Sequence, residues 1–366
     1  MNTLQNQAPK VGARKASAQA WMALVTAVFE AAGSHAGEAA QLADHLVGAN
    51  LAGHDSHGVG AIPTYLRFLR EGRVYANREP EIVQGGGLIT VFDAGAGYGQ
   101  PAANHVMRHA AEIASRDGAA LVALRNSHHV GRIGAYGEAL AKVGLASIHF
   151  VNALLPKPVV APHGGSDARL ATNPLCIALP GSEPVILDFA TSAIALGKVR
   201  VALNKELQVP PGCLIDAHGN ATTAPQTLFS DPIGALLPLG GHKGWALAFL
   251  IEILGGALTG HGTAADAGSR ERGVANGMFS IVFDPDRFVP RTELQARIDL
   301  LAAYVKASPA REGGVLLPGE PERIARHERG SGGIEVDAAT WSEIAGEVAA
   351  LRVDLDLEKF FDERRC

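Results

Sequence analysis

The fold is decided by residues 88–150, which read LITVFDAGAGYGQPAANHVMRHAAEIASRDGAALVALRNSHHVGRIGAYGEALAKVGLASIHF. Three short apolar runs in this stretch are typical of strands, at Leu88–Phe92, Ala119–Leu124 and Leu145–Phe150. Between them, the segments at about 101–116 and 132–142 have the apolar spacing that predicts helices. This alternation predicts an α/β region in the middle of the chain.

Helical patterns lie on both sides of this region. The first expected helix is capped by Ser17 and ends at about Ala32. Others are expected at 37–52, 291–307 and 338–351. The other expected elements are strands at Pro184–Asp188 and Gly277–Phe283, a buried helix at Gly244–Leu258, and surface loops at Ala310–Gly333.

The order of these patterns predicts a fold of the α/β (α+β) class with more than one domain. A chain of 366 residues is long for a single core. We expect residues 1–80 to form an N-terminal helical domain and residues 81–235 to form an α/β domain, to which residues 270–290 return. Residues 236–269 and 291–366 are expected to be helical segments that join the first domain.

The composition favours a small-molecule ligand over a nucleic acid or a membrane. The net charge is -5, and acidic and basic residues are mixed along the chain. The most apolar stretch, Trp245–Leu258, is shorter than the ~20 residues that cross a bilayer. Met1–Lys15 lacks the apolar core of a signal peptide and is expected to be a frayed start. Because Cys176, Cys213 and Cys366 are far apart, we expect no disulfide framework and a reducing, cytoplasmic compartment.

The first candidate site is HDSHG at residues 54–58, between two expected helices. Polar side chains in a row at such a junction are costly unless they are used or capped. One interpretation is a helix cap by Asp55 or Ser56 beside exposed histidines. The other makes His57 a general acid/base that Ser56 orients, because imidazole titrates near neutral pH. A third interpretation is a metal site, but no acidic residue or cysteine stands at a spacing typical of metal ligands.

Two further motifs stand at expected helix starts. NSHHVG at 126–131 follows a strand, and a strand end that opens on a helix N-terminus favours anions such as a pyrophosphate, although a plain polar turn is the alternative. GGHKG at 240–244 places Lys243 against the helix dipole, which is unfavourable unless an anion binds there too. The glycines at 95–99 only superficially suggest a dinucleotide fingerprint, because the third is misplaced, so we predict no Rossmann fold.

Taken together and in order, these motifs resemble the malate/L-lactate dehydrogenase family, which is unrelated to the Rossmann-type lactate dehydrogenases. The landmarks are Asp55–Val59, Gly99–Gln100, Asn126–Tyr136, Thr172–Pro174, Asp188–Ser192, Gly197–Lys198, Leu239–Gly244, Asn276–Gly277 and Leu317–Glu320. They span nearly the whole chain. The run SHGVGAIP at 56–63 is similar to the hydroxycarboxylate dehydrogenase B type of this family.

The resemblance implies a largely antiparallel sheet that binds NAD or NADP in a non-Rossmann manner, and hydride transfer between that cofactor and a small 2-hydroxy or 2-keto acid. It also implies a homodimer, which fits the low charged content of 19% because a second subunit can cover apolar surface. His57 would be the catalytic acid/base, with Ser56 and Lys198 beside it and Thr172 and His242 near substrate. The implied cofactor contacts are His129, Val130, Gly131, Arg132, Ile133, Asp188, Phe189, Ala190, Lys243, Gly319 and Glu320.

Some assignments stay open. His129 is a catalytic candidate in ureidoglycolate-type relatives, so either histidine could exchange the proton. Ala61 stands where many members carry an arginine that clamps a carboxylate, so another group must bind the substrate acid. Lys198 differs from the acidic residue associated with cyclic imine reductases. The alternatives are a ureidoglycolate, sulfolactate or diketogulonate dehydrogenase or a cyclic imine reductase of this family, a metal-dependent hydrolase, or a cofactor-binding protein without turnover. We expect NAD rather than NADP.

Overall fold

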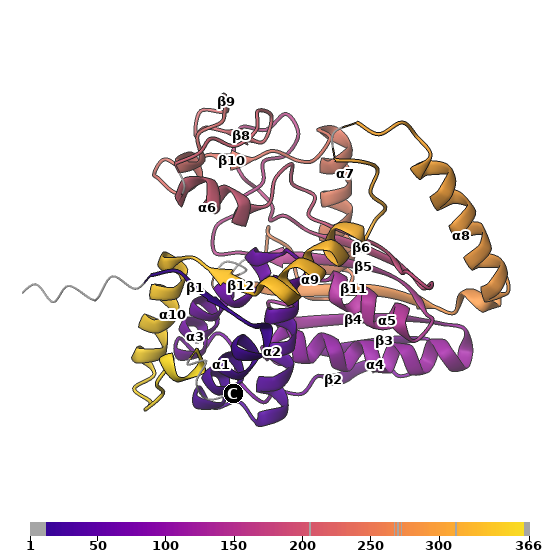
Figure 1. Ribbon diagram of the computed structural model, residues 1–366, viewed down its shortest axis with the longest axis horizontal. Coiled ribbons are helices and arrows are strands. Elements are labelled where there is room, and N and C mark those ends of the chain that lie inside the picture. The colour runs from indigo at the N-terminus through magenta and orange to yellow at the C-terminus, as the bar shows by residue number, and fades with distance from the viewer. Residues whose placement is uncertain are drawn as a thin grey trace, which may run out of the picture.

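The computed structural model describes residues 12–361 except 205, 267, 269, 270, 272 and 312, and a seven-stranded sheet lies at its centre (Figure 1). In spatial order the strands are β2 (Glu81–Gly85), β3 (Ile89–Asp93), β4 (Ala119–His128), β11 (Ala275–Phe283), β5 (Ala146–Leu154), β6 (Leu175–Leu179) and β7 (Val185–Phe189). Neighbours β3 and β4 are parallel, and the other neighbouring pairs are antiparallel. The α/β class and the largely antiparallel sheet are thus confirmed.

Helices α4 (Gly99–Asp117) and α5 (Gly134–Lys142) pack against the sheet and share its apolar core. Helix α4 ends at Gly118, whose φ of 95° is a left-handed cap that favours glycine. Gly137 of α5 lets that helix approach closely, because a Cβ there would lie 2.8 Å from the Ala178 Cβ of β6. The central stretch therefore folds as alternating strands and helices.

Helix α7 (His242–Ile251) continues into a π-helical segment, Glu252–Ala257, on the side of the sheet away from α4 and α5 (Figure 1). The approach depends on Gly255, where a Cβ would lie 2.5 Å from a backbone nitrogen of β5. The expectation of a buried helix is wrong for one face, since Phe249 and Leu250 are 51% and 53% exposed. The expected union of this segment with the helical domain also differs from the structure, because its buried side packs on β5 and β11.

A second core is built mainly from helices, namely α1 (Ala18–Ala31), α2 (Ala36–Leu51), α3 (Ile62–Arg70) and α10 (Ala338–Ala350). Both ends of the chain contribute: the Trp21 and Trp341 rings meet edge to face at 5.9 Å, and β1 (Arg14–Ala16) pairs with β12 (Ile334–Val336). Ser17 Oγ accepts from Ala20 N, as its predicted cap role requires. The expected frayed start is wrong for β1, and residues 1–11 lie outside the described residues.

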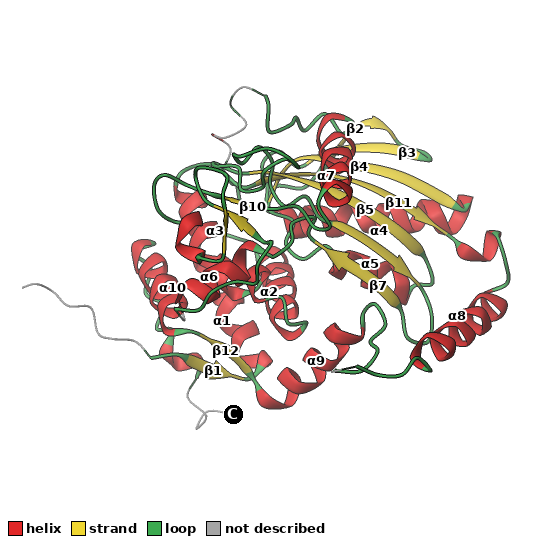
Figure 2. Ribbon diagram, turned by 90° about the horizontal axis from the view of Figure 1, so that it is seen from above, coloured by secondary structure: helices red, strands yellow, loops and turns green. Residues whose placement is uncertain are grey.

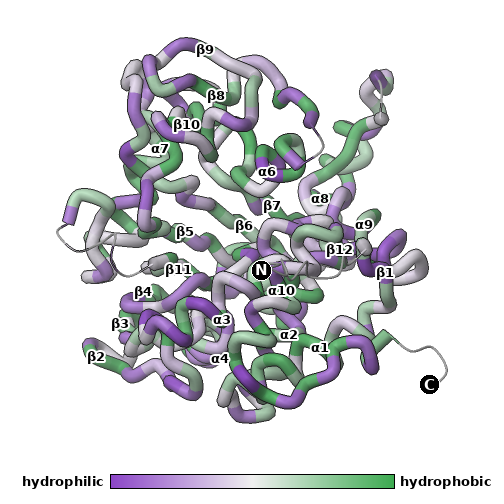
Figure 3. The backbone as a smooth tube through the Cα atoms, turned by 90° about the vertical axis from the view of Figure 1, so that its left-hand side faces the viewer, coloured by the Kyte–Doolittle hydropathy of each residue, from purple (hydrophilic) through white to green (hydrophobic). Residues whose placement is uncertain are grey.

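A small third sheet was not expected. It consists of β8 (Leu214–Ile215), β9 (Ala221–Thr222) and β10 (Ala235–Leu236), with α6 (Leu196–Asn204) packed beside it. Figure 3 shows this unit on the opposite side of the central sheet from the helices of the second core. The N-terminal end of α6 returns toward the HDSHG turn, which brings distant parts of the chain together there.

Two helices follow the last central strand. Helix α8 (Arg291–Lys306) lies at the rim of the molecule (Figure 2) and buries none of its residues. Helix α9 (Glu320–Gly332) lies where we expected surface loops, so that expectation is wrong for its residues. Its start is explained by Pro321, since proline suits the first turn of a helix.

Two further results concern the environment. In the described part of the chain, no helix is both long and apolar enough to cross a membrane. Cys176 and Cys213 are buried, unpaired thiols, whereas Cys366 lies outside the described residues.

The remaining short helices are η1 (Asp55–His57), η2 (Val59–Ala61), η3 (Pro225–Leu228), η6 (Pro285–Arg287) and η7 (Glu358–Phe360).

Candidate active site

The HDSHG motif forms a single turn of 3-10 helix, η1, directly after α2. Asp55 is bound from two sides: Asn50 Nδ2 donates to it at 2.7 Å, and Arg329 of α9 forms a bidentate pair at 2.5 and 3.0 Å. Gly58 is required here because a Cβ would lie 2.2 Å from Asn50 Oδ1. Neither Asp55 nor Ser56 caps a helix, so the capping interpretation is not supported.

His57 is half-buried, and its Nδ1 lies 2.9 Å from Ser56 Oγ. Its ring stacks on that of His129, with centroids 5.5 Å apart and planes 24° apart. Burial, together with the nearby His54 and Arg132, lowers the pKa of His57 to about 4. His57 is therefore neutral near pH 7 and able to accept a proton. We call His57 and His129 the histidine pair.

His129 is held by two residues to which the sequence analysis gave no role in the site, although Gln100 is among the family landmarks. Its Nδ1 lies 2.6 Å from the Tyr65 hydroxyl of α3, which in turn lies 2.6 Å from Gln100 Nε2 of α4. Burial also lowers the pKa of His129 well below its usual range, and it raises the pKa of Tyr65. The two histidines are thus neutral neighbours that lie on different segments.

Next to the histidine pair lies a group of acidic and basic side chains, which we call the charged cluster. Its members are His54, Arg132, Glu138, Asp188, Glu322 and Arg326. The Arg132 side chain is 2% exposed and lies 2.8 Å from Glu138 and 3.5 Å from Asp188. Glu138 also pairs with Arg326 at 2.6 Å, and His54 bonds Glu322 at 3.0 Å, so α9 is tied to α5 and to the turn after α2.

Asp188, at the end of β7, takes the position that we expected an anionic ligand to occupy. Its Oδ2 accepts from the Gly134 amide at the start of α5, at 2.9 Å. The next amides of this helix donate to the carbonyls of Arg132 and Ile133. Asp188 therefore caps the Gly134 amide from within the chain, so that amide is not free for a pyrophosphate.

Lys198 stands on a helix that packs against the HDSHG turn. A Cβ on the preceding residue, Gly197, would lie 2.4 Å from the Ser56 Cβ, so α6 touches the η1 turn. Lys198 itself is exposed, and within the described residues its ammonium forms no hydrogen bond or ion pair. Thr172 accepts through its carbonyl from both the amide and the hydroxyl of Thr191, at 2.9 and 3.0 Å.

Other predicted residues lie farther from the histidine pair or serve the framework. His242 and Lys243 are exposed at the start of α7, where the His242 ring contacts His163. Glu320 pairs with Lys306, and the segment before it runs beside β7, since Pro318 O accepts from Ile186 N. The predicted positions that are buried or partly buried without a charged role are Val130, Gly131, Ile133, Phe189, Ala190 and Gly319.

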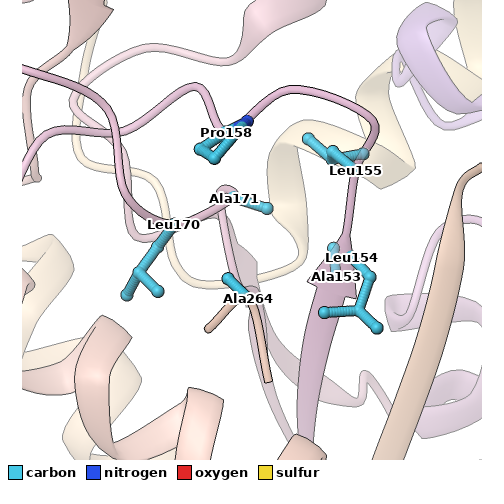
Figure 4. Close-up of a pocket in the computed structure, with 7 residues that line it drawn as sticks. All are labelled: Ala153, Leu154, Leu155, Pro158, Leu170, Ala171 and Ala264. Carbon is cyan, nitrogen blue, oxygen red and sulfur yellow. The ribbon is translucent and has the colours of Figure 1, made fainter. Parts of the chain in front are cut away.

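Two hollows accompany these elements. One of about 10 Å³ lies between Leu154, Pro158 and Ala171 (Figure 4), and it has room for a single water molecule only. A larger cleft of about 450 Å³ is lined by Arg73, Tyr75 and other residues beside the end of β4. Neither hollow is lined by the histidine pair.

Across the described ranges, no three His, Cys, Asp or Glu side chains gather as a metal site would require.

Comparison with known proteins gives a consistent result. The model of the malate/L-lactate dehydrogenase family matches residues 16–345. Hydroxycarboxylate dehydrogenase B of Escherichia coli K12 is 44% identical over 332 residues, 89% of this chain and 91% of that protein. L-lactate dehydrogenase of Cupriavidus necator is 38% identical, over 85% of this chain and 90% of that protein. The solved structure of sulfolactate dehydrogenase from Methanocaldococcus jannaschii superposes with a TM-score of 0.83 at 32% identity, covering 95% and 100% of the two chains.

Proposed function

Because this chain belongs to the malate/L-lactate dehydrogenase family, we propose that it transfers a hydride between a nicotinamide cofactor and a small 2-hydroxy or 2-keto acid. The observation that carries the proposal is the state of His57. Its Nδ1 is engaged by Ser56, while its Nε2 has no hydrogen bond to any described residue. A neutral, partly accessible imidazole of this kind suits a general base.

His57 then performs the proton transfer. In oxidation its neutral ring accepts the proton of the substrate hydroxyl, and in reduction the imidazolium returns a proton to the carbonyl oxygen. A substrate carboxylate beside His57 raises its pKa, which favours this protonated form. Ser56 holds the ring in place. The chemistry that a bound nicotinamide supplies is hydride transfer at the carbon that carries this oxygen.

The charged cluster has the groups needed to hold a dinucleotide. Glu322 is 17% exposed, and its hydrogen bond with His54 lowers the pKa of its carboxyl, so it is ionised. An ionised carboxylate accepts from ribose hydroxyls and repels the additional phosphate of NADP. The cluster holds three carboxylates and two guanidinium groups, which supports NAD as the preferred cofactor.

Lys198 is our candidate for the group that binds the substrate carboxylate. The usual arginine position is Ala61, which packs against the second core. Lys198 instead places an unpaired ammonium on a helix that touches Ser56. Because ammonium is a compact point charge, it leaves the orientation of the acid less constrained than an arginine fork, and this fits a broad range of hydroxy acids.

The substrate class is tested with the purified chain and a panel of 2-keto acids, including pyruvate, oxaloacetate and sulfopyruvate. NADH and NADPH are each supplied, and the loss of nicotinamide absorbance is followed. We expect turnover of at least one of these acids, with NADH preferred. Ureidoglycolate and a cyclic imine in the same panel separate the alternatives within the family. Binding of NADH without turnover of any member would contradict the proposal.

We also propose that the chain forms a homodimer. Support comes from α8, where Leu300, Leu301 and Tyr304 are 62–79% exposed on a helix that buries none of its own residues. Soluble monomers seldom present such a contiguous apolar face. Sedimentation should give twice the chain mass, and Leu300→Glu should reduce it to the monomer. A monomeric native protein would rule the dimer out.

A further inference from the structure

The Tyr65 hydroxyl occupies the middle of a chain of hydrogen bonds that ends on His129. Gln100 Nε2 donates to it at 2.6 Å, and His129 Nδ1 lies on its other side, also at 2.6 Å. An amide nitrogen can only donate, so the Tyr65 oxygen is the acceptor in the first bond. A phenol has a single proton, and burial raises the pKa of Tyr65, so that proton is kept. His129 Nδ1 is the only other hydrogen-bond partner of this hydroxyl among the described residues. Because a buried hydroxyl proton without an acceptor is costly, the proton points at His129 Nδ1.

This arrangement determines where His129 carries its own proton. A neutral imidazole has one N–H, and the nitrogen that accepts a hydrogen bond is the other one. With Nδ1 accepting from Tyr65, the N–H is on Nε2. The stack with His57 keeps the ring beside the group that exchanges a proton with substrate.

We propose that Tyr65 and Gln100 are positioning residues that fix His129 as its Nε2–H tautomer, so that His129 donates a hydrogen bond to the substrate oxygen while His57 alone exchanges the proton. This inference rests on the function proposed above. It assigns different tasks to two histidines that stack on each other, because their Nδ1 atoms have different hydrogen-bond partners. A donor aimed at the oxygen stabilises the negative charge that develops there.

The partner of His57 does not impose such a restriction. The Ser56 hydroxyl can donate or accept, so it holds the His57 ring in either protonation state. For His129 to take up a second proton at Nδ1, the bond from Tyr65 would have to break. His129 is therefore a poor proton acceptor at the atom that the protein holds, and His57 is the base.

The tautomer can be observed directly in protein labelled with ¹⁵N-histidine, by long-range ¹H–¹⁵N correlation without substrate. We expect His129, assigned by the loss of its signals in His129→Gln, to show a protonated Nε2 and an unprotonated Nδ1 at pH 7. A protonated Nδ1 would mean that Gln100 presents its oxygen to Tyr65, and it would overturn the inference. Because this experiment needs no turnover, it succeeds or fails independently of the substrate panel.

Tyr65→Phe and Tyr98→Phe make a matched pair of variants. Both tyrosines are buried and their ring centroids are 6.1 Å apart, but the Tyr98 hydroxyl has no hydrogen-bond partner among the described residues. We expect Tyr65→Phe to move the Nδ1 shift of His129 and introduce the other tautomer, while Tyr98→Phe leaves the spectrum of His129 unchanged. Equal spectra for the two variants would count against a specific role of the Tyr65 hydroxyl.

A pH profile separates this assignment from one in which His129 is the base. We expect Tyr65→Phe to lower kcat/KM for hydroxy-acid oxidation about tenfold, the size of one lost hydrogen bond, without moving the midpoint of its acid limb. If His129 were the base, loss of the bond to its Nδ1 would raise its pKa and move that midpoint to higher pH. Such a shift, absent in Tyr98→Phe, would disprove the division of tasks.

Discussion

The histidine pair and the charged cluster share two short segments, yet they differ in charge. His54 and His57 share the turn after α2, and His129 and Arg132 share the turn after β4. One residue of each turn belongs to the pair and the other belongs to the cluster. Within about one helical turn, the chain therefore changes from neutral imidazoles to side chains that are bonded to carboxylates.

The partners explain the difference. Ser56 and Tyr65 offer hydroxyls to the histidine pair, and burial lowers the pKa of both rings. In the cluster, Glu138 and Glu322 instead offer carboxylates, to Arg132 and His54 respectively. The histidine pair thus contacts hydroxyls, whereas His54 and Arg132 contact carboxylates.

The largest effect is expected from His57→Ala, which removes the proposed base. The turnover number should fall about 10²- to 10⁴-fold, the usual contribution of an acid/base residue, while the Kd for NADH changes little. His218→Ala is a suitable control because His218 is exposed on the small third sheet. Steady-state kinetics and fluorescence titration with NADH measure the two quantities. Unchanged turnover in His57→Ala would remove this residue from the mechanism.

Arg132→Met probes the charged cluster instead. It leaves Glu138 and Asp188 without their buried partner, so the free energy of unfolding should fall by about 3–5 kcal/mol in urea titrations. Arg169→Met breaks a pair whose side chains are 65% and 61% exposed, and it should cost less than about 1 kcal/mol. If both variants lost similar amounts of unfolding free energy, burial of the charged cluster would make no additional contribution to stability.

The neutrality of buried histidines should appear in the pH dependence of stability. His149 is fully buried between two serine hydroxyls, and burial lowers its pKa from 6.5 to about 4. Between these values the unfolded chain binds a proton that the folded chain does not, so stability falls as pH decreases. His149→Gln should reduce this slope by about 1.4 kcal/mol per pH unit, measured by urea titration from pH 7 to 4. His218→Gln should leave the slope unchanged, and the opposite ranking would contradict the expectation.

The smallest effect concerns cofactor choice. Glu322→Gln removes one carboxylate from the cluster and should shift the ratio of kcat/KM values for NADH and NADPH about fivefold toward NADPH. Glu328→Gln removes the same charge from an exposed position of α9 and should leave the ratio unchanged. If both variants shift the ratio alike, the net charge of α9 matters rather than the contact with His54.

Local patterns were sufficient to predict much of the framework. The apolar runs at 88–92, 119–124 and 145–150 correspond to β3, β4 and β5, because a strand in a covered sheet needs apolar residues on both faces. The segment 310–333 was misjudged because its glycines and prolines outweighed the helical pattern of α9. The small third sheet was missed because its strands have only two residues each.

The site could be predicted only as far as its motifs reach. The polar run at 54–58 and the two histidines at 128–129 are visible in the sequence. Only the fold, however, brings the first motif beside the second, where His57 stacks on His129. Tyr65 and Gln100 stand in ordinary helical patterns, so nothing local marks them as partners of His129. The filling of the α5 terminus by Asp188 could not be anticipated either, because 54 residues separate the two bonded groups.

The bond between Asp55 and Arg329 has a consequence for biosynthesis. These two side chains are 274 residues apart in the sequence. A nascent polypeptide therefore contains the η1 turn long before Arg329, which bonds Asp55, is translated. The contacts of the η1 turn are thus completed late in synthesis, after all strands of the central sheet have been translated. Asn50 is encoded close to Asp55, so its bond to that carboxylate can form long before the bond from Arg329.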